Sequence, residues 1–297
     1  MNTWLTTTLG NISVHRKLSL GFGLVLMLTL LITLTGWIGL ASIIDRSNKL
    51  STISDTVALV KDLRIARVSY DRDNGANGPA EVNDLLNRIE NNLKQASTQL
   101  VLSQDLAMIH QELQAVAQYT TIFSQIDEAT QAREVSRTQL GASADSAVAR
   151  IEAIEQDVLK GNDLAMLNRV DQLARSVQNA RFHVRGYTYS GAADTAQPAL
   201  DAINQAQAQL TRLSATLPTE YALPLQHIKE ALTRYGDTFV QFRDSQMLSD
   251  QQQSTLKTLG DSLVDVSHQL ADLQTEKRDS DAQQAKTALA LCAALAL

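Results

Sequence analysis

The clearest pattern in the chain is a run of uncharged, mostly apolar residues near its N-terminus. Leu18–Ile44 contains no charged residue, and Arg16 and Lys17 directly precede it. About 20 apolar residues are enough to cross a bilayer, so this run is predicted to be a transmembrane helix. Because basic residues mark the cytoplasmic side of such a helix, residues 1–17 are expected in the cytoplasm and the following residues outside the inner membrane.

A cleaved signal peptide is the alternative interpretation of this run. The run is longer than the apolar region of a signal peptide, and no small-residue cleavage site stands out after it. The chain becomes apolar again over residues 287–297, a run too short to cross a bilayer, which needs about 20 residues. We expect this run to begin a second transmembrane helix, which leaves residues 45–284 as an external domain.

The external domain has the spacing of amphipathic helices. Apolar residues recur three and four positions apart, and turn signals such as Asn74–Pro79 and Ser190–Gly191 interrupt the pattern. Asp163 is placed to cap a helix N-terminus. The pattern predicts six helices, at residues 45–74, 80–102, 105–160, 163–190, 196–216 and 220–283.

The lengths of these helices predict how they pack. At about 1.5 Å per residue, helix 105–160 is roughly twice as long as its neighbours. Short connections make sequential helices antiparallel. The predicted fold is therefore all-α, with two stacked four-helix bundles that share the long helices 105–160 and 220–283. The first two helices complete the bundle near the membrane, and the fourth and fifth complete the far bundle.

Composition and charge exclude several classes of function. The chain is 44% hydrophobic and 4% aromatic, a mixture that favours helix. Its net charge is −6, and no basic cluster follows Arg16 and Lys17, so nucleic-acid binding is not expected. Cys292 is the only cysteine, so the external domain has no disulfide. No phosphate loop, nucleophile elbow or metal-ligand spacing is present, and we expect no enzyme activity, cofactor or metal.

Arginines continue the apolar series of two predicted helices. In helix 45–74, the series Val57 and Val60 runs on to Arg64 and Arg67. Arginine is rarely buried without a partner, so such positions need an anion. The planar guanidinium group binds both oxygens of a carboxylate. The alternative is that these arginines pair with acidic side chains of neighbouring helices.

Helix 163–190 repeats the pattern. Val170, Ala174 and Val177 lead to Arg181, and Arg185 follows one turn later. Helix lengths place the two arginine clusters about 30 Å apart along the axis, one in each bundle. Side chains at matching heights on the other helices complete two candidate carboxylate sites.

The candidate ligand-binding residues of the near bundle are Arg64, Arg67, Tyr119, Thr121 and Lys257. Those of the far bundle are Arg137, Arg181, Arg185, Arg234 and Tyr235, where Tyr187, Thr188 and Tyr189 could add hydroxyl groups.

Four short segments resemble bacterial methyl-accepting chemotaxis proteins. Lys17–Gly23 and Leu34–Trp37 are similar to the entry and end of the first transmembrane helix of that family. Asp62–Arg67 and Ala180–Tyr187 resemble its helical bimodular periplasmic sensor domain. The resemblance covers the whole chain, although each motif is short.

This resemblance implies a ligand and a set of partners. Such family members bind small organic acids, such as tricarboxylic-acid-cycle intermediates, in the near bundle, and some bind acetate in the far bundle. Arg64 and Arg67 match the near-site arginines, which can come from two subunits of a homodimer. The full-length family adds a membrane-adjacent HAMP segment and a cytoplasmic coiled coil, through which it reaches the chemotaxis kinase and coupling protein.

The sequence thus favours the inner-membrane sensor region of a chemoreceptor for small carboxylates. Binding would draw arginines from different helices together and displace the last helix relative to the membrane. The alternatives are the sensor half of a histidine kinase, an ectodomain that docks a periplasmic binding protein, and a structural helical anchor.

Overall fold

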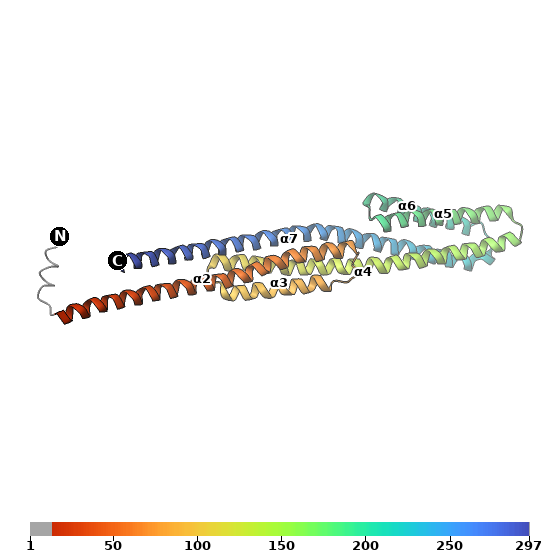
Figure 1. Cartoon of the computed structure of the whole chain (residues 1–297). Coiled ribbons are helices and arrows are strands. Elements are labelled where there is room, and N and C mark those ends of the chain that lie inside the picture. The colour runs from red at the N-terminus through yellow and green to blue at the C-terminus, as the bar shows by residue number, and fades with distance from the viewer. Residues whose placement is uncertain (1–13, 297) are drawn as a thin grey trace. The chain divides into compact units, whose positions relative to one another are not determined.

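The computed structural model describes residues 14–296, which are almost entirely helical (Figure 1). The predicted all-α class is confirmed. Within this range the helices are α2 (Val14–Arg72), α3 (Ala80–Gln99), α4 (Ser103–Lys160), α5 (Leu164–Ser190), α6 (Ala196–Ser214) and α7 (Ala222–Ala296), with short 3-10 turns η1 (Ala193–Thr195) and η2 (Thr219–Tyr221).

The first and last helices are longer than predicted. The apolar run and helix 45–74 form one uninterrupted helix, α2, because no glycine or proline lies between residues 40 and 72. In the same way α7 continues past residue 283 into the second apolar run. The inner connections fall within three residues of their predicted places. Most of the predicted cytoplasmic segment, residues 1–13, lies outside the described residues.

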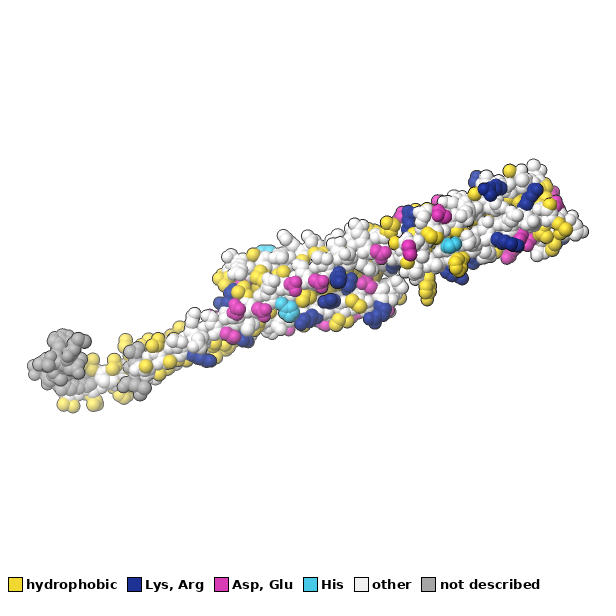
Figure 2. Space-filling view, turned by 90° about the horizontal axis from the view of Figure 1, so that it is seen from above, with side chains coloured by type: hydrophobic (Ala, Val, Ile, Leu, Met, Phe, Trp, Pro, Cys, Tyr) yellow, Lys and Arg dark blue, Asp and Glu magenta, His cyan; other side chains and the backbone are white. Residues whose placement is uncertain are grey.

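The start of α2 has the character of a membrane helix. Among the described residues, one stretch near the N-terminus is long and apolar enough to cross a membrane, with a mean hydropathy of 2.2, and none of it is buried. Figure 2 shows its hydrophobic side chains on the surface. Exposed apolar side chains over such a length indicate a segment that contacts lipid or another chain.

The described residues divide into two compact units. Unit 1 comprises residues 14–66, 82–117 and 260–296, and unit 2 comprises residues 67–81 and 118–259. Helices α2, α4 and α7 contribute residues to both units. Each unit buries its own set of apolar side chains and is described by itself below.

Unit 1 has a core built from four helices. Each helix contributes side chains at spacings of three, four or seven residues, as packed antiparallel helices require. The buried residues include Ile53, Val60 and Leu63 of α2, Leu86, Ile89 and Leu93 of α3, Ile109 and Val116 of α4, and Leu263 and Leu270 of α7.

Two buried polar contacts join α4 to α7 within the unit 1 core. Asp105 accepts hydrogen bonds from Gln274 Nε2 at 2.8 Å and from Lys277 Nζ at 2.6 Å. One heptad along α4, Glu112 accepts a hydrogen bond from Ser267 Oγ at 2.6 Å. The two pairs are seven residues apart on both helices, so they form a polar ladder between antiparallel partners. Buried polar groups that find partners in only one alignment specify the register of the helices.

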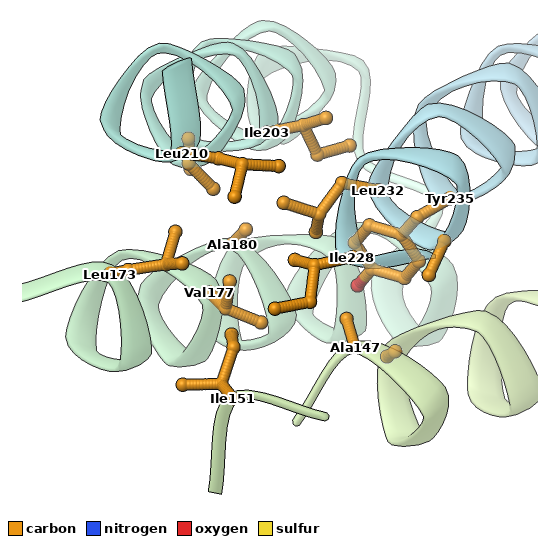
Figure 3. Close-up of a cluster of buried hydrophobic side chains, with 14 of the residues drawn as sticks. Ala147, Ile151, Leu173, Val177, Ala180, Ile203, Leu210, Ile228, Leu232 and Tyr235 are labelled. Atoms are coloured by element: carbon orange, nitrogen blue, oxygen red, sulfur yellow. The ribbon is translucent and has the colours of Figure 1, made fainter. Parts of the chain in front are cut away.

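Unit 2 is a second four-helix arrangement. Residues of α4, α5, α6 and α7 form one continuous apolar cluster (Figure 3). Helices α5 and α6 lie side by side as a hairpin (Figure 1). At one end of the cluster the Tyr187 ring packs edge-on against Phe239 and Phe242, with ring centroids 5.5 and 6.0 Å apart. Tyr187 is therefore a core residue, and a role for its hydroxyl in a ligand site stays a prediction.

The ends of α5 follow the chemistry that the sequence predicted. Asp163 caps the N-terminus, where its carboxylate accepts a hydrogen bond from the backbone N–H of Met166 at 2.9 Å. Gly191 ends the helix in the left-handed conformation, with φ of 65°, and donates its N–H to the carbonyl of Tyr187 at 2.8 Å. Glycine suits this position because it has no Cβ to clash.

Replacement of Gly191 by alanine should destabilise the chain by about 1 kcal/mol, because a Cβ is strained at positive φ. Gly186→Ala is the matched control in the same helix. Its Cβ would meet no atom within 4 Å, so the substitution should stabilise by about 0.5–1 kcal/mol. Denaturant unfolding of the solubilised full chain measures both. Equal effects at the two glycines would contradict the left-handed helix end.

Glu112 should make stability depend on pH. Burial raises the pKa of its carboxyl from 4.5 to about 7, against the opposing hydrogen bond from Ser267. Between these two values the folded chain holds a proton that the unfolded chain has lost. The contribution of Glu112 to stability therefore falls as pH rises through this window, by about 3 kcal/mol in total.

Glu112→Gln should remove this fall, so that the variant gains on the wild type between about pH 4.5 and 7. Glu152→Gln, an exposed change in the same helix, is the control and should leave the profile unchanged. Unfolding free energies measured across this range decide the matter. Parallel profiles for the wild type and Glu112→Gln would count against a protonated Glu112.

Candidate functional site

Arg64 lies on the surface of unit 1. Its side chain is 64% exposed and is 3.7 Å from the carboxylate of Asp261. The prediction that the core stripe of α2 ends in Arg64 is therefore wrong. The core instead follows Leu63 and Ala66, and Arg64 flanks it. A pair this exposed contributes little to stability, so the guanidinium group remains accessible to an anion from solvent.

Arg67, which belongs to unit 2, is better shielded. Its side chain is 15% exposed and forms an ion pair with Asp71 at 3.3 Å. Burial raises the pKa of the Asp71 carboxyl, and the charges of Arg67 and Arg133 act in the opposite direction. The structure also brings Arg67 close to the buried Tyr119. Burial raises the pKa of the Tyr119 hydroxyl, while the charge of Arg67 opposes this rise.

The other two near-bundle candidates do not join this pair. Thr121 is exposed and follows Tyr119 by two positions, so it points about 200° around α4 from the buried tyrosine. Lys257 is exposed on α7. Of the near-bundle candidates in unit 2, the structure therefore groups Arg67 and Tyr119 and leaves Thr121 and Lys257 on the surface.

Unit 2 contains a cavity that is lined by residues predicted for the far-bundle site. It has a volume of about 680 Å³. Four of the five far-bundle candidates line it. The lining residues are Arg137, Leu140, Gly141 and Ala144 of α4, Gln178, Arg181, Phe182, Val184, Arg185, Thr188 and Tyr189 of α5, and Tyr235 of α7.

The three arginines of the cavity differ in what they already bind. Arg181 forms an ion pair with Asp145 at 2.8 Å. Arg137 donates to the carbonyl of Thr188 at 3.2 Å and lies 3.5 Å from Glu134. Arg185 forms no ion pair with any residue of the described range 14–296. Its guanidinium group is therefore the one best able to accept an anion in this cavity.

Tyr235 is a buried wall of the same cavity. Burial raises the pKa of its hydroxyl, and the positive charges of Arg181 and Arg185 oppose the rise. Both arginines therefore lie close enough to act on this hydroxyl electrostatically. Arg234, the fifth candidate, does not face the cavity. Adjacent helical residues point about 100° apart, and Arg234 lines a separate hollow with Gln139 and Asp237.

Several residues in and around this cavity were not predicted from the sequence. Phe182 was overlooked as a cavity residue because an exposed aromatic side chain carries no periodic signal. Asp145 was missed because its pairing with Arg181 joins different helices. Arg133 could have been found, since it lies seven residues from both Ile126 and Leu140, in the core stripe of α4. It is buried, and it donates to Gln246 at 2.5 Å and Thr130 at 3.3 Å.

These groups can hold an anion in a partly apolar space. Guanidinium groups and a hydroxyl supply hydrogen-bond donors, and leucine, alanine, valine and aromatic side chains supply the remaining walls. Within residues 14–296 no cluster of three or more histidine, cysteine or acidic side chains could hold a metal ion. The arrangement is suited to recognition of a ligand.

Comparison with known proteins agrees with this architecture. The model of the helical bimodular sensor domain family matches residues 37–285. The chain is 42% identical over its full length to methyl-accepting chemotaxis protein McpQ of Pseudomonas putida, and covers 47% of that protein. It is 31% identical to McpS of the same species, also over its full length and 47% of the relative.

A third relative is more distant. McpK of Pseudomonas aeruginosa is 24% identical over 79% of the chain and 37% of its own length. The chain thus spans about half the length, or less, of the curated relatives it matches. The family match covers most of the chain, including all of unit 2 and most of unit 1, and the chain therefore belongs to the family of helical bimodular sensor domains.

Proposed function

We propose that this chain is the sensor region of a chemoreceptor that binds small organic acids. The cavity of unit 2 carries the proposal, because three arginines and two tyrosines line a space of about 680 Å³. Carboxylates are the common small ligands for a guanidinium fork. The family match and the chemotaxis relatives supply the context of a sensor.

The ligands proposed are di- and tricarboxylates, such as tricarboxylic-acid-cycle intermediates, at the near-bundle arginines, and a monocarboxylate, of which acetate is a small example, in the far bundle. Arg64 is accessible and weakly paired, which suits a first contact with a polyanion. In unit 2, Arg67 is held in place by Asp71 at 3.3 Å and is a separate candidate contact for a carboxylate. A homodimer, in which two subunits share these arginines, belongs to the same proposal.

The proposed output is a displacement of α7. Ligand binding would favour one of two packings of the helices and so move the last helix relative to the inner membrane, with the sensor domain in the periplasm. The cytoplasmic chemotaxis kinase and coupling protein would receive this signal through a part of the protein beyond residue 297. The chemotaxis relatives favour this assignment over the sensor half of a histidine kinase.

The solubilised full chain should bind at least one acid from a panel of aliphatic and aromatic carboxylates. Ligand at about 100 times its dissociation constant should add about 2.7 kcal/mol of stability, seen as a higher melting temperature. Arg185→Gln should remove binding in unit 2, whereas Arg169→Gln, an exposed arginine elsewhere on α5, should not. If no acid binds while a periplasmic protein does, the docking alternative replaces this proposal.

Replacement of Arg64 and replacement of Arg67 by alanine should have different effects on the stability of the chain. Arg64→Ala should abolish binding of the di- or tricarboxylate but cost less than about 1 kcal/mol of stability, because its ion pair is exposed. Arg67→Ala should cost about 1–3 kcal/mol, because Asp71 loses its partner in a partly buried position. Asp71→Asn in the Arg67→Ala background should recover part of that loss. Unfolding and calorimetry on these three variants and the wild type test this. Unfolding caused by Arg64→Ala would make Arg64 a structural residue.

A further inference from the structure

The cavity of unit 2 has one uncompensated positive charge. Arg181 has a close partner in Asp145, at 2.8 Å, whereas Arg137 has a longer, half-exposed pair with Glu134, at 3.5 Å, and also lies over the Phe242 ring, 5.7 Å from its centroid. Arg185 has no such partner among the described residues. A ligand with a single carboxylate balances this charge without breaking an existing pair.

A second or third carboxylate would meet opposition in the cavity. To bind one, Arg181 would have to release Asp145, whose carboxylate is 2.8 Å away and would remain near the ligand. Like charges brought together disfavour a ligand, and such repulsion is a common source of specificity. The side chain of Asp145 therefore selects against polycarboxylates at this site.

The rest of the cavity is suited to a ring. Phe182 and Tyr189 both line it and remain 74% and 93% exposed. They lie seven residues apart on α5, so they share one face of the helix, and Arg185 lies between them on that face. The chain has only 4% aromatic residues, so two exposed rings beside an unpaired guanidinium group are not explained by composition. Tyr235 adds a third ring from α7.

Volume and lining disfavour acetate as a complete fit. A cavity of about 680 Å³ is within the range of sites for drug-sized ligands, whereas acetate has only two carbon atoms. Acetate could pair with Arg185, but it would leave Phe182 and Tyr189 in contact with water. An aromatic body would cover these side chains, and stacked or edge-on ring pairs add favourable energy beyond burial.

We propose that the cavity of unit 2 binds an aromatic monocarboxylate, whose carboxylate pairs with Arg185 and whose ring packs against Phe182 and Tyr189. Asp145 acts there as the residue that determines specificity, because it occupies Arg181 and repels further carboxylates. This inference rests on the proposed function, since it names the class of acid recognised at one of its sites.

The test is calorimetry on the solubilised full chain with benzoate, 4-hydroxybenzoate and phenylacetate, compared with acetate, citrate and uncharged benzamide. At least one aromatic acid should bind ten-fold or more tightly than acetate, and benzamide should not bind measurably. Phe182→Ala and Tyr189→Ala should each weaken the aromatic acid five- to ten-fold and leave acetate unchanged. Leu164→Ala is the control, an exposed apolar residue of α5 outside the cavity lining.

Two further variants test the roles of Arg185 and Asp145. Arg185→Gln should abolish aromatic acid binding, and Asp145→Asn should improve the binding of citrate at this site at least ten-fold relative to benzoate. If acetate or citrate binds as tightly as every aromatic acid and depends on Arg185, the ring inference is wrong while the proposed function stands. If no acid of any class binds, both are wrong. Aromatic acid binding that survives Phe182→Ala and Arg185→Gln would also overturn the inference.

Discussion

The structure depends on the burial of apolar side chains that recur every seven residues along each helix. Isolated helices gain little stability from their own hydrogen bonds, so each must cover such a stripe with other helices. In α5 the stripe of Val170, Val177 and Val184 is fully buried, and positions next to it, such as Arg181 and Arg185, are left at the edge. At such an edge an arginine can keep its guanidinium group in water while its aliphatic stem covers apolar neighbours. The candidate site is thus formed by residues that flank the stripe.

The distinction between positions in the buried stripe and positions beside it also decides how much of the fold and of the site could be predicted from the sequence. The all-α class, the inner connections and the ends of α5 follow from periodicity, a capping aspartate and a left-handed glycine. The burial of the arginines did not follow, because a spacing of three and four fits two neighbouring stripes. Arg67 lies seven residues from Val60 and is largely shielded, whereas Arg64 lies seven from Val57, at the border of the core, and is exposed. A related error concerns Tyr235 and Arg234. The prediction placed both in one site, but adjacent residues of a helix face different directions. Contacts between helices, such as Arg181 with Asp145, require the tertiary alignment.

The cavity illustrates how a recognition site differs from a stable core. Asp145 and Glu134 neutralise two of its three arginines before any ligand arrives, which limits the cost of placing three like charges together. Phe182 and Tyr189 remain in water although burial of either ring would be favourable. Local departures of this kind from the most stable arrangement are expected where a ligand completes the packing.

The polar ladder of unit 1 limits how far α7 can travel along α4. Three hydrogen bonds of 2.6–2.8 Å join the helices, from Gln274 and Lys277 to Asp105 and from Ser267 to Glu112. A slide of one helical turn, about 5.4 Å, would break all three and leave both buried carboxyl groups without these partners. Shifts of an ångström or so would only stretch these bonds. The two pairs therefore permit small movements of α7 along α4 and oppose a shift by a full helical turn. A signal carried by α7 in this unit would therefore be a displacement much smaller than one helical turn.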